Sequence, residues 1–179
     1  MKPCIICTLN TPIGLITITE FHKGVVRLDF DSGEAALADK DLRIMGRDRR
    51  FFDDATPSIP TKKQFFDSAM QICENFAGTR KEFDLPIVIS APEDSFERKV
   101  YEQLNLIPYG TVISYAVLAA RSSSPKAYRA AGNANAKNKI PIILPCHRVI
   151  AKDGTLGGYS GGLEIKRILL KLEKAPISF

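Results

Sequence analysis

Residues 114–138, with the sequence SYAVLAARSSSPKAYRAAGNANAKN, contain two short helical patterns separated by a run of serines. Ser114 is a favourable N-cap for a first helix that ends at Arg121. Ser124 can cap a second helix with Pro125 at its first position, where the missing N–H costs nothing. Two short helices joined by a tight polar turn predict a helix-turn-helix.

The second of these helices carries small residues at helical spacing, namely Ala127, Ala130, Ala131 and Ala134. Their side chains are too small to build a large core. Tight packing against another helix is the better interpretation of this stripe by itself, and close approach of the backbone to a binding partner is the alternative.

Further helices are predicted on both sides of this segment. Asp94 and Glu97 resemble a capping box that opens a helix, which ends before the sequence IPYG at residues 107–110. An amphipathic pattern predicts a last helix from Leu163 to Lys174. Its apolar residues are expected to face inward and its lysines outward: Leu163, Ile168, Leu169 and Leu172 against Lys166, Lys171 and Lys174.

The first part of the chain has strand patterns instead. Apolar and charged residues alternate along residues 24–31, and residues 1–31 as a whole predict a strand meander. The polar residues 34–60 predict a solvated connector. A helix is expected at residues 62–77, with a buried face made of Phe65, Ala69, Cys73 and Phe76.

The expected fold is an α/β protein of two domains. A proline-marked linker in residues 83–95 places the boundary near residue 90. Residues 1–90 should form an N-terminal antiparallel-sheet α/β domain, and residues 91–179 a mainly helical C-terminal domain with the helix-turn-helix. The composition, with 45% hydrophobic and 25% charged residues, is that of an ordinary globular protein.

The formal net charge of +5 is distributed unevenly. Residues 1–90 carry 12 Lys and Arg against 13 Asp and Glu, whereas residues 91–179 carry 13 against 7. A basic half-chain suggests a polyanionic partner. Nucleic acid is the commonest such partner, and a membrane surface or plain solubility are the alternatives.

The N-terminal residues show neither a signal-peptide pattern nor an apolar stretch long enough to span a membrane, so we expect an intracellular protein with reduced thiols. Cys4, Cys7 and His22 suggest a zinc site. However, residues three apart on a strand face opposite sides, and a fourth ligand is not evident. We therefore expect no metal.

Residues 143–162, ILPCHRVIAKDGTLGGYSGG, place Cys146 between a proline and a histidine, ahead of a glycine-rich loop. A thiol is a strong nucleophile only as the thiolate, and His147 and Arg148 are the local candidates for a proton acceptor or a positive field. His147 would reach the thiol through a water rather than directly. For a lone Cys-His pair, a buried structural thiol beside a core histidine is the better interpretation.

The pair is not alone in this sequence. The segments IPYGTVISYAVLA, YRAAGNA, LPCHRVI and GTLGGYSGGLEIKRILLKLE together resemble the O6-alkylguanine-DNA alkyltransferase family, the methylated-DNA–protein-cysteine methyltransferases, over about residues 91–174. The resemblance implies a DNA repair protein that flips O6-alkylguanine out of duplex DNA and transfers the alkyl group irreversibly to Cys146, one lesion per molecule. It further implies no cofactor, no membrane partner, a monomer, and a place in the cytoplasm, or in the nucleus of a eukaryote.

The resemblance also implies roles for individual residues. Cys146 is the nucleophile, His147 its base through a water, and Glu173 the group that orients His147. Asn138 ties the turn that presents Cys146. Substrate contacts are implied for Tyr115, Val149, Tyr159 and Ser160, together with the backbone carbonyl of Cys146. Contacts with the DNA minor groove are implied for Arg129, which fills the vacated stack, and for Tyr115, Ala127, Ala130, Ala131 and Gly132.

Two residues depart from the family pattern. Lys139 stands where many relatives have proline, which leaves the stiffness of that turn open, and Tyr101 stands where tryptophan is common. Two other functions also stay open. A DNA-binding protein that recognises lesions without chemistry would not need Cys146. A cysteine hydrolase or thiol redox protein acting on a small molecule would leave Arg129 and the basic half unexplained.

Overall fold

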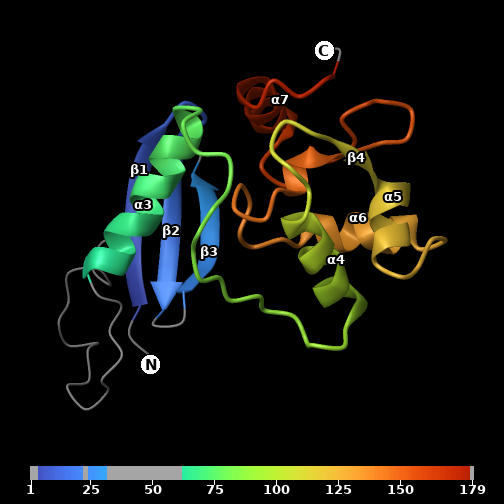
Figure 1. The fold of residues 1–179 in the computed structure, drawn as a ribbon, viewed down its shortest axis with the longest axis horizontal. Helices are drawn as coiled ribbons and strands as arrows, with labels where there is room; N and C mark the ends of the chain where they lie inside the picture. Colours follow the sequence, from blue (N-terminus) through green and yellow to red (C-terminus); the bar gives the residue numbers. More distant parts are fainter. Residues whose placement is uncertain (1–3, 22–23, 32–61, 178–179) are drawn as a thin grey trace. The chain divides into compact units, whose positions relative to one another are not determined.

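The computed structural model describes residues 4–21, 24–31 and 62–177, so the expected connector at residues 34–60 lies outside the described part. The chain divides into two compact units, Met1–Val88 and Ile89–Phe179. The first unit holds an antiparallel sheet with a helix, and the second is mainly helical (Figure 1). The α/β fold class expected from the sequence is confirmed.

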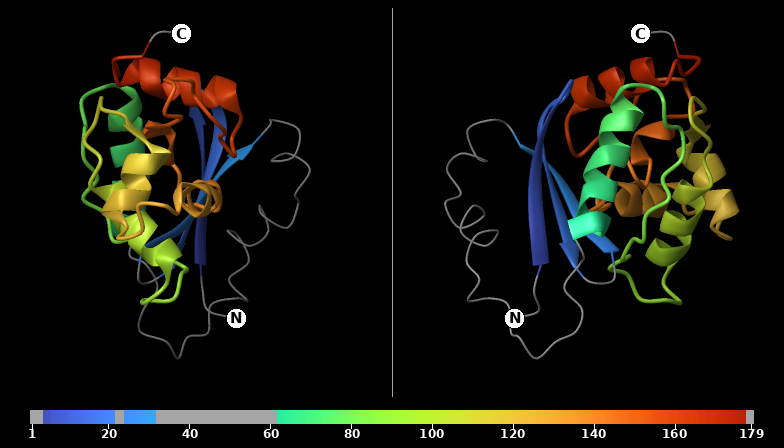
Figure 2. Two further views of the ribbon diagram at one scale, coloured as in Figure 1. Left: turned by 90° about the vertical axis from the view of Figure 1, so that its right-hand side faces the viewer. Right: turned by 60° about the vertical axis from the view of Figure 1, so that its left-hand side comes forward.

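The described residues of the first unit form a three-stranded antiparallel sheet in the order β1 (Cys4–Thr11), β2 (Gly14–Phe21) and β3 (Gly24–Asp31). Helix α3 (Lys62–Phe76) lies across one face of this sheet (Figure 2, right). Almost completely buried apolar side chains form the core of the unit: Ile16, Ile18, Val25, Leu28 and Ile72. Their removal from water is the main source of its stability.

The strict alternation expected along β3 is wrong in detail. The pairing of β3 with β2 shifts register at Thr19/Glu20, where Val26 is the extra residue of a β-bulge. Val25 and Leu28 therefore supply the buried apolar side chains of β3, and Val26 is only partly buried.

The buried face of α3 also differs from the expected one. Ser68 and Ile72 are buried whereas Cys73 is exposed, so the prediction that Cys73 belongs to the core is wrong. The hydroxyl of Ser68 donates a hydrogen bond to the buried carboxyl group of Glu20 on β2. This polar contact orients the helix with Ser68 toward the sheet, a choice that apolar periodicity does not reveal. The side chain of Phe65 lies outside the described residues.

The second unit packs four helices of the described chain around a shared apolar core: α4 (Phe96–Asn105), α5 (Tyr115–Arg121), α6 (Tyr128–Ala136) and α7 (Leu163–Leu172). A short parallel pair joins β4 (Ile113–Ser114) to β5 (Val149–Ile150). The 3₁₀ helix η2 (Cys146–Arg148) comes directly before β5. The β4–β5 pair therefore holds the start of α5 beside the turn that carries Cys146.

The helix caps are predicted with mixed success. The hydroxyl of Ser114 accepts a hydrogen bond from the backbone N–H of Val117, so the expected cap of α5 is confirmed. For α4 the cap is Ser95, which accepts from the N–H of Arg98, and not Asp94. Each of the two polar residues is a good N-cap, and only the backbone path decides which one is used.

The second helix of the helix-turn-helix begins later than expected. α6 starts at Tyr128 with Ala127 at the N-cap position, so the predicted cap at Ser124 is wrong. Ser123 has a left-handed backbone conformation, with φ of 63°, and the carbonyl of Ser124 accepts from the N–H of Ala127. The residues around Pro125 therefore form the turn between the two helices and are not part of α6.

Candidate active site

Cys146 is the first residue of η2, and only 1% of its surface is exposed. Two asparagines of the preceding segment brace this turn. Asn138 donates from Nδ2 to the carbonyl of Leu144, 2.8 Å away, and its Oδ1 accepts from the N–H of Ile140. Nδ2 of Asn135 lies 3.3 Å from the carbonyl oxygen of Cys146 itself. Asn135 was missed by the sequence analysis, although its spacing of three from Asn138 could have indicated it.

His147 and Glu173 form a buried pair. Nε2 of His147 lies 2.9 Å from Oε1 of Glu173, and both side chains are at least nine-tenths buried. Because an ionised carboxylate only accepts hydrogen bonds, Nε2 carries the proton. Nδ1 of His147 is also buried and has no hydrogen-bond partner in the described part of the chain. The imidazole therefore keeps one nitrogen available as an acceptor.

Arg148 pairs with the same carboxylate. Its Nη2 lies 2.8 Å from Oε1 of Glu173, and its Nε lies 2.9 Å from Oε2. Burial alone would raise the pKa of Glu173, but the hydrogen bonds and charges of His147 and Arg148 outweigh it and lower the pKa to about 2. The negative charge of Glu173 thus compensates the positive charge of Arg148. A positive field that favours the thiolate of Cys146 must therefore come from another residue.

That source is Lys166 on α7, which the amphipathic pattern placed on the outer face. Lys166 is instead completely buried, and Leu163 is 45% exposed, so this part of the prediction is wrong. The ammonium nitrogen lies 2.6 Å from the carbonyl oxygen of Val149 and 2.5 Å from that of Leu156, with Gly158 as a third acceptor. Burial lowers the pKa of Lys166 to about 8.

Opposing effects act on the thiol of Cys146. Burial raises its pKa, whereas hydrogen bonds with the side chains of Asn138 and Tyr159 and the charge of Lys166 lower it. The net direction is upward. The resting group is therefore a thiol, and a nearby proton acceptor is needed to make it a nucleophile.

The glycine-rich loop closes over Tyr115. The hydroxyl of Tyr115 lies 3.3 Å from the carbonyl oxygen of Gly158, to which it donates. A Cβ atom on Gly157, whose φ is +65°, would come within 3.0 Å of the Tyr115 ring. Tyr159 is half-buried and Ser160 is exposed on the same loop. Tyr115 at the start of α5 thus contacts the loop that carries Tyr159 and Ser160, through Gly157 and Gly158.

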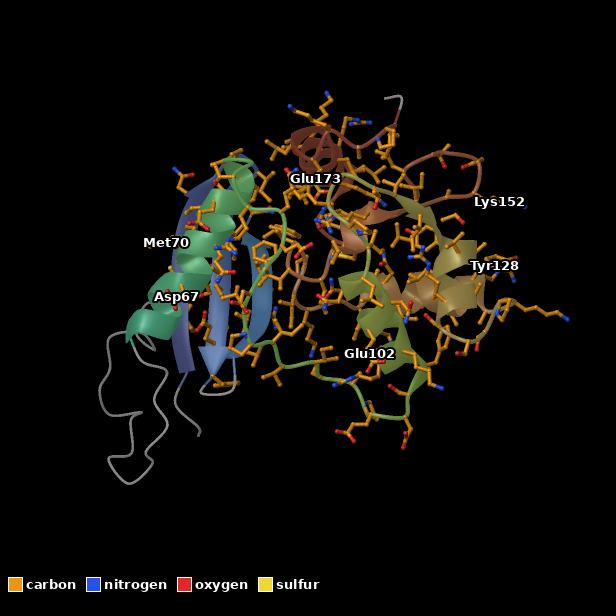
Figure 3. The ribbon with its side chains drawn as sticks, in the orientation of Figure 1. Asp67, Met70, Glu102, Tyr128, Lys152 and Glu173 are labelled. Atoms are coloured by element: carbon orange, nitrogen blue, oxygen red, sulfur yellow. The ribbon has the colours of Figure 1, made fainter. Side chains whose placement is uncertain are left out.

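Helix α6 presents only part of the expected DNA-facing set. Arg129 and Ala130 are exposed, and Ala127 and Gly132 are half-buried. Ala131 is completely buried and offers no surface to DNA, which corrects its expected contact. Ala131 packs inside the unit because its position faces the neighbouring helices. Tyr128, beside Arg129, lies at the outer edge of α6, far from Glu173 at the end of α7 (Figure 3).

Two family models match the chain. Residues 5–89 match the 6-O-methylguanine DNA methyltransferase, ribonuclease-like domain, and residues 95–175 match the 6-O-methylguanine DNA methyltransferase, DNA binding domain. The chain belongs to the 6-O-methylguanine DNA methyltransferase family. The resemblance found in the sequence, and the methyltransferase activity expected from it, are confirmed.

Members of this family with known sequences align over most of the chain. The methylated-DNA–protein-cysteine methyltransferase of Methanosarcina barkeri is 40% identical over 93% of this chain and 94% of its own length. The constitutive enzyme of Bacillus subtilis is 41% identical over 93% of each chain. These alignments include both units.

Solved structures of the family agree with the fold. The Mycobacterium tuberculosis O6-methylguanine methyltransferase superposes with a TM-score of 0.72 at 32% identity, covering 96% of this chain and 93% of the other. The M. tuberculosis protein in complex with DNA gives the same TM-score at 34% identity, covering 94% and 93%. With the matching DNA-binding domain, these likenesses identify DNA as the partner of the chain.

Neither a membrane span nor a metal centre is found in the described ranges. No helix there is long and apolar enough to cross a membrane. No three or more His, Cys, Asp or Glu side chains among the same residues form a group that could hold a metal ion. His22, one of the zinc candidates, lies outside the described residues.

Proposed function

We propose that this protein repairs DNA by taking the alkyl group of O6-alkylguanine onto Sγ of Cys146, once per molecule. The buried His147–Glu173 pair beside Cys146, with Nδ1 of His147 left as an acceptor, is the observation that carries the proposal. Asn138 holds the turn that presents the thiol. The reaction needs no cofactor, because the thiolate supplies the electron pair and the guanine is the leaving group.

The proposed transfer is a single displacement. A water between Cys146 and Nδ1 of His147 carries the thiol proton to the imidazole, whose positive charge Glu173 offsets. The thiolate attacks the alkyl carbon, a C–S bond forms, and the bond between that carbon and O6 breaks. The released guanine takes up the proton, so the products are a thioether and an unmodified base.

DNA binding is proposed to use the exposed surface of α6 in the minor groove. The lesion leaves the stack, Arg129 fills the vacated position, and Tyr115 with Ser160 contacts the flipped base. The exposure of Arg129 and Ala130 supports this placement. The carbonyl of Val149 is proposed to accept from the guanine amino group. That carbonyl already accepts from Lys166, so the base must share or replace this contact.

The compartment follows from the substrate. A protein that acts on DNA with a free thiol belongs with the genome in a reducing environment, so we place it in the cytoplasm, or in the nucleus of a eukaryote. The reaction requires one chain only, and we propose that the protein acts as a monomer.

Mass spectrometry tests the proposal. The protein is incubated with duplex DNA that carries one O6-methylguanine, and the intact mass and the Cys146 peptide are measured. We expect one added methyl group on Cys146, saturating at one per molecule, and none in Cys146→Ser. Cys73→Ser, which removes an exposed thiol of the first unit, should react like the wild type. Lesion binding without a mass gain would instead indicate a lesion-recognising protein.

A further inference from the structure

The carboxylate of Glu173 accepts hydrogen bonds from other groups as well as from the imidazole of His147. Oε1 accepts from His147 at 2.9 Å and from Nη2 of Arg148 at 2.8 Å. Oε2 accepts from Nε of Arg148 at 2.9 Å and from the N–H of Gly110 at 3.1 Å. Arg148 is therefore the principal partner of Glu173, with two nitrogens on one carboxylate.

Arg148 is also held on its far side. Its third guanidinium nitrogen, Nη1, lies 2.6 Å from the carbonyl oxygen of Ile107, and the guanidinium carbon lies 5.6 Å from the ring centroid of Tyr109. Only 5% of the residue is exposed. A buried guanidinium with partners on each edge cannot leave Glu173 without losing several hydrogen bonds.

The charges of Glu173, Arg148 and His147 cancel only while His147 is neutral. Glu173 carries one negative charge and Arg148 one positive charge, so a proton on His147 would leave an excess positive charge in a buried site. Lys166 on α7 also acts on the imidazole, and the phenol groups of Tyr109 and Tyr159 act on Glu173. The thiol of Cys146 directly precedes His147 in the chain. Burial lowers the pKa of His147, Glu173 raises it, and Arg148 and Lys166 lower it.

We propose that Arg148 is a positioning residue that shares Glu173 with His147 and thereby keeps the imidazole neutral, with the proton on Nε2 and Nδ1 ready to accept. This inference rests on the proposed role of His147 as the base for Cys146. Without Arg148, the whole charge of Glu173 would face His147 and favour the imidazolium form. An imidazolium has no acceptor nitrogen and cannot take the thiol proton.

The ionisation of His147 can be measured without DNA. The chain has two histidines, so NMR of the imidazole nitrogens resolves His147, and a His22→Gln variant assigns its signal. In the wild type we expect a neutral ring protonated on Nε2 around neutral pH. In Arg148→Met the titration of His147 should move to higher pH. The control Arg167→Met removes an arginine of a surface pair with Glu164 on α7 and should leave the titration unchanged.

The pH profile of alkyl transfer gives a second measurement. Arg148→Met should react about tenfold more slowly than the wild type at about pH 6.5, and the difference should shrink as the pH rises and His147 loses its proton. Arg148→Lys restores the positive charge and should return the profile toward that of the wild type. A purely structural role would lower the reactive fraction equally at every pH.

An unchanged titration of His147 in Arg148→Met overturns the proposal, even if the melting temperature falls. Arg148→Gln replaces Arg148→Met if the latter does not fold, since it keeps a donor for Glu173 without the charge and the same shift is expected. A shift of the His147 titration with no methyl transfer by the wild type would refute the proposed function, and only the effect of Arg148 on the ionisation of His147 would stand.

Discussion

The ammonium nitrogen of Lys166 lies 2.6 Å from the backbone carbonyl oxygen of Val149. Lys166 has no exposed surface. The same nitrogen lies 2.5 Å from the carbonyl of Leu156 in the glycine-rich loop. One charged side chain of α7 therefore ties that loop to the segment that follows Cys146. The position of the loop relative to the thiol depends on this contact.

Replacement of Lys166 by Met should impair both stability and alkyl transfer. The apolar side chain leaves buried carbonyls without their donor, which should lower the free energy of unfolding by about 2 kcal/mol. Transfer to Cys146 should slow by about tenfold or more, because the loop and the thiol lose their fixed geometry. Urea unfolding and single-turnover rates measure the two effects. Lys171→Met, at an exposed position of the same helix, is the control, and a wild-type rate in Lys166→Met would contradict the expectation.

Replacement of Gly157 by Ala should disturb the loop in two ways. Its φ of +65° disfavours a side chain, and the new Cβ would lie 3.0 Å from the Tyr115 ring. We expect a loss of about 2 kcal/mol in the free energy of unfolding, together with slower transfer as Tyr115 is displaced. Gly154→Ala isolates the backbone effect, because Gly154 has φ of +85° with nothing within 4 Å of its Cβ position. Equal losses in the two variants would show that the Tyr115 contact is unimportant.

Replacement of Arg129 by Ala should affect duplex DNA specifically. The side chain is exposed, so the free energy of unfolding should change by less than about 0.5 kcal/mol. If Arg129 fills the stack, transfer from a duplex lesion should slow by about tenfold or more, whereas transfer from the free base O6-methylguanine should not change. Lys152→Ala, at an exposed loop position, controls for lost positive charge (Figure 3). An equal loss with the free base would assign Arg129 to the chemistry instead.

Acid should destabilise the protein through Glu173. Its carboxyl has a pKa of about 2 in the folded chain and an ordinary value of 4.5. The unfolded chain therefore binds this proton first as the pH falls, and the stabilisation present above pH 4.5 is lost toward pH 2, by about 3 kcal/mol. Denaturant unfolding across this range should show a weaker pH dependence in Glu173→Gln than in the wild type. The exposed Glu164→Gln serves as control, and matching slopes for all three proteins would argue against the effect.

Local sequence patterns predicted which helices and strands form. They did not predict the buried face of α3 or the residue at which α6 begins. The strand meander, the helix-turn-helix and the Ser114 cap depend on contacts within a few residues, which the sequence displays directly. The exposed Cys73 and the late start of α6 depend on a buried polar bond from Ser68 and on a left-handed Ser123. Periodicity carries no information on either.

The sequence by itself determined the family and the fold class and indicated Cys146 as the proposed nucleophile, because the PCHRV segment and the segments around it are contiguous stretches of chain. Only the tertiary structure decided which charges meet in the site. Glu173 lies 25 residues from Arg148 along the chain, and their pairing exists only where α7 ends against η2. Lys166 looks like a surface lysine in the amphipathic pattern. It is buried because carbonyl oxygens from separate turns of the chain converge on its ammonium group and replace water.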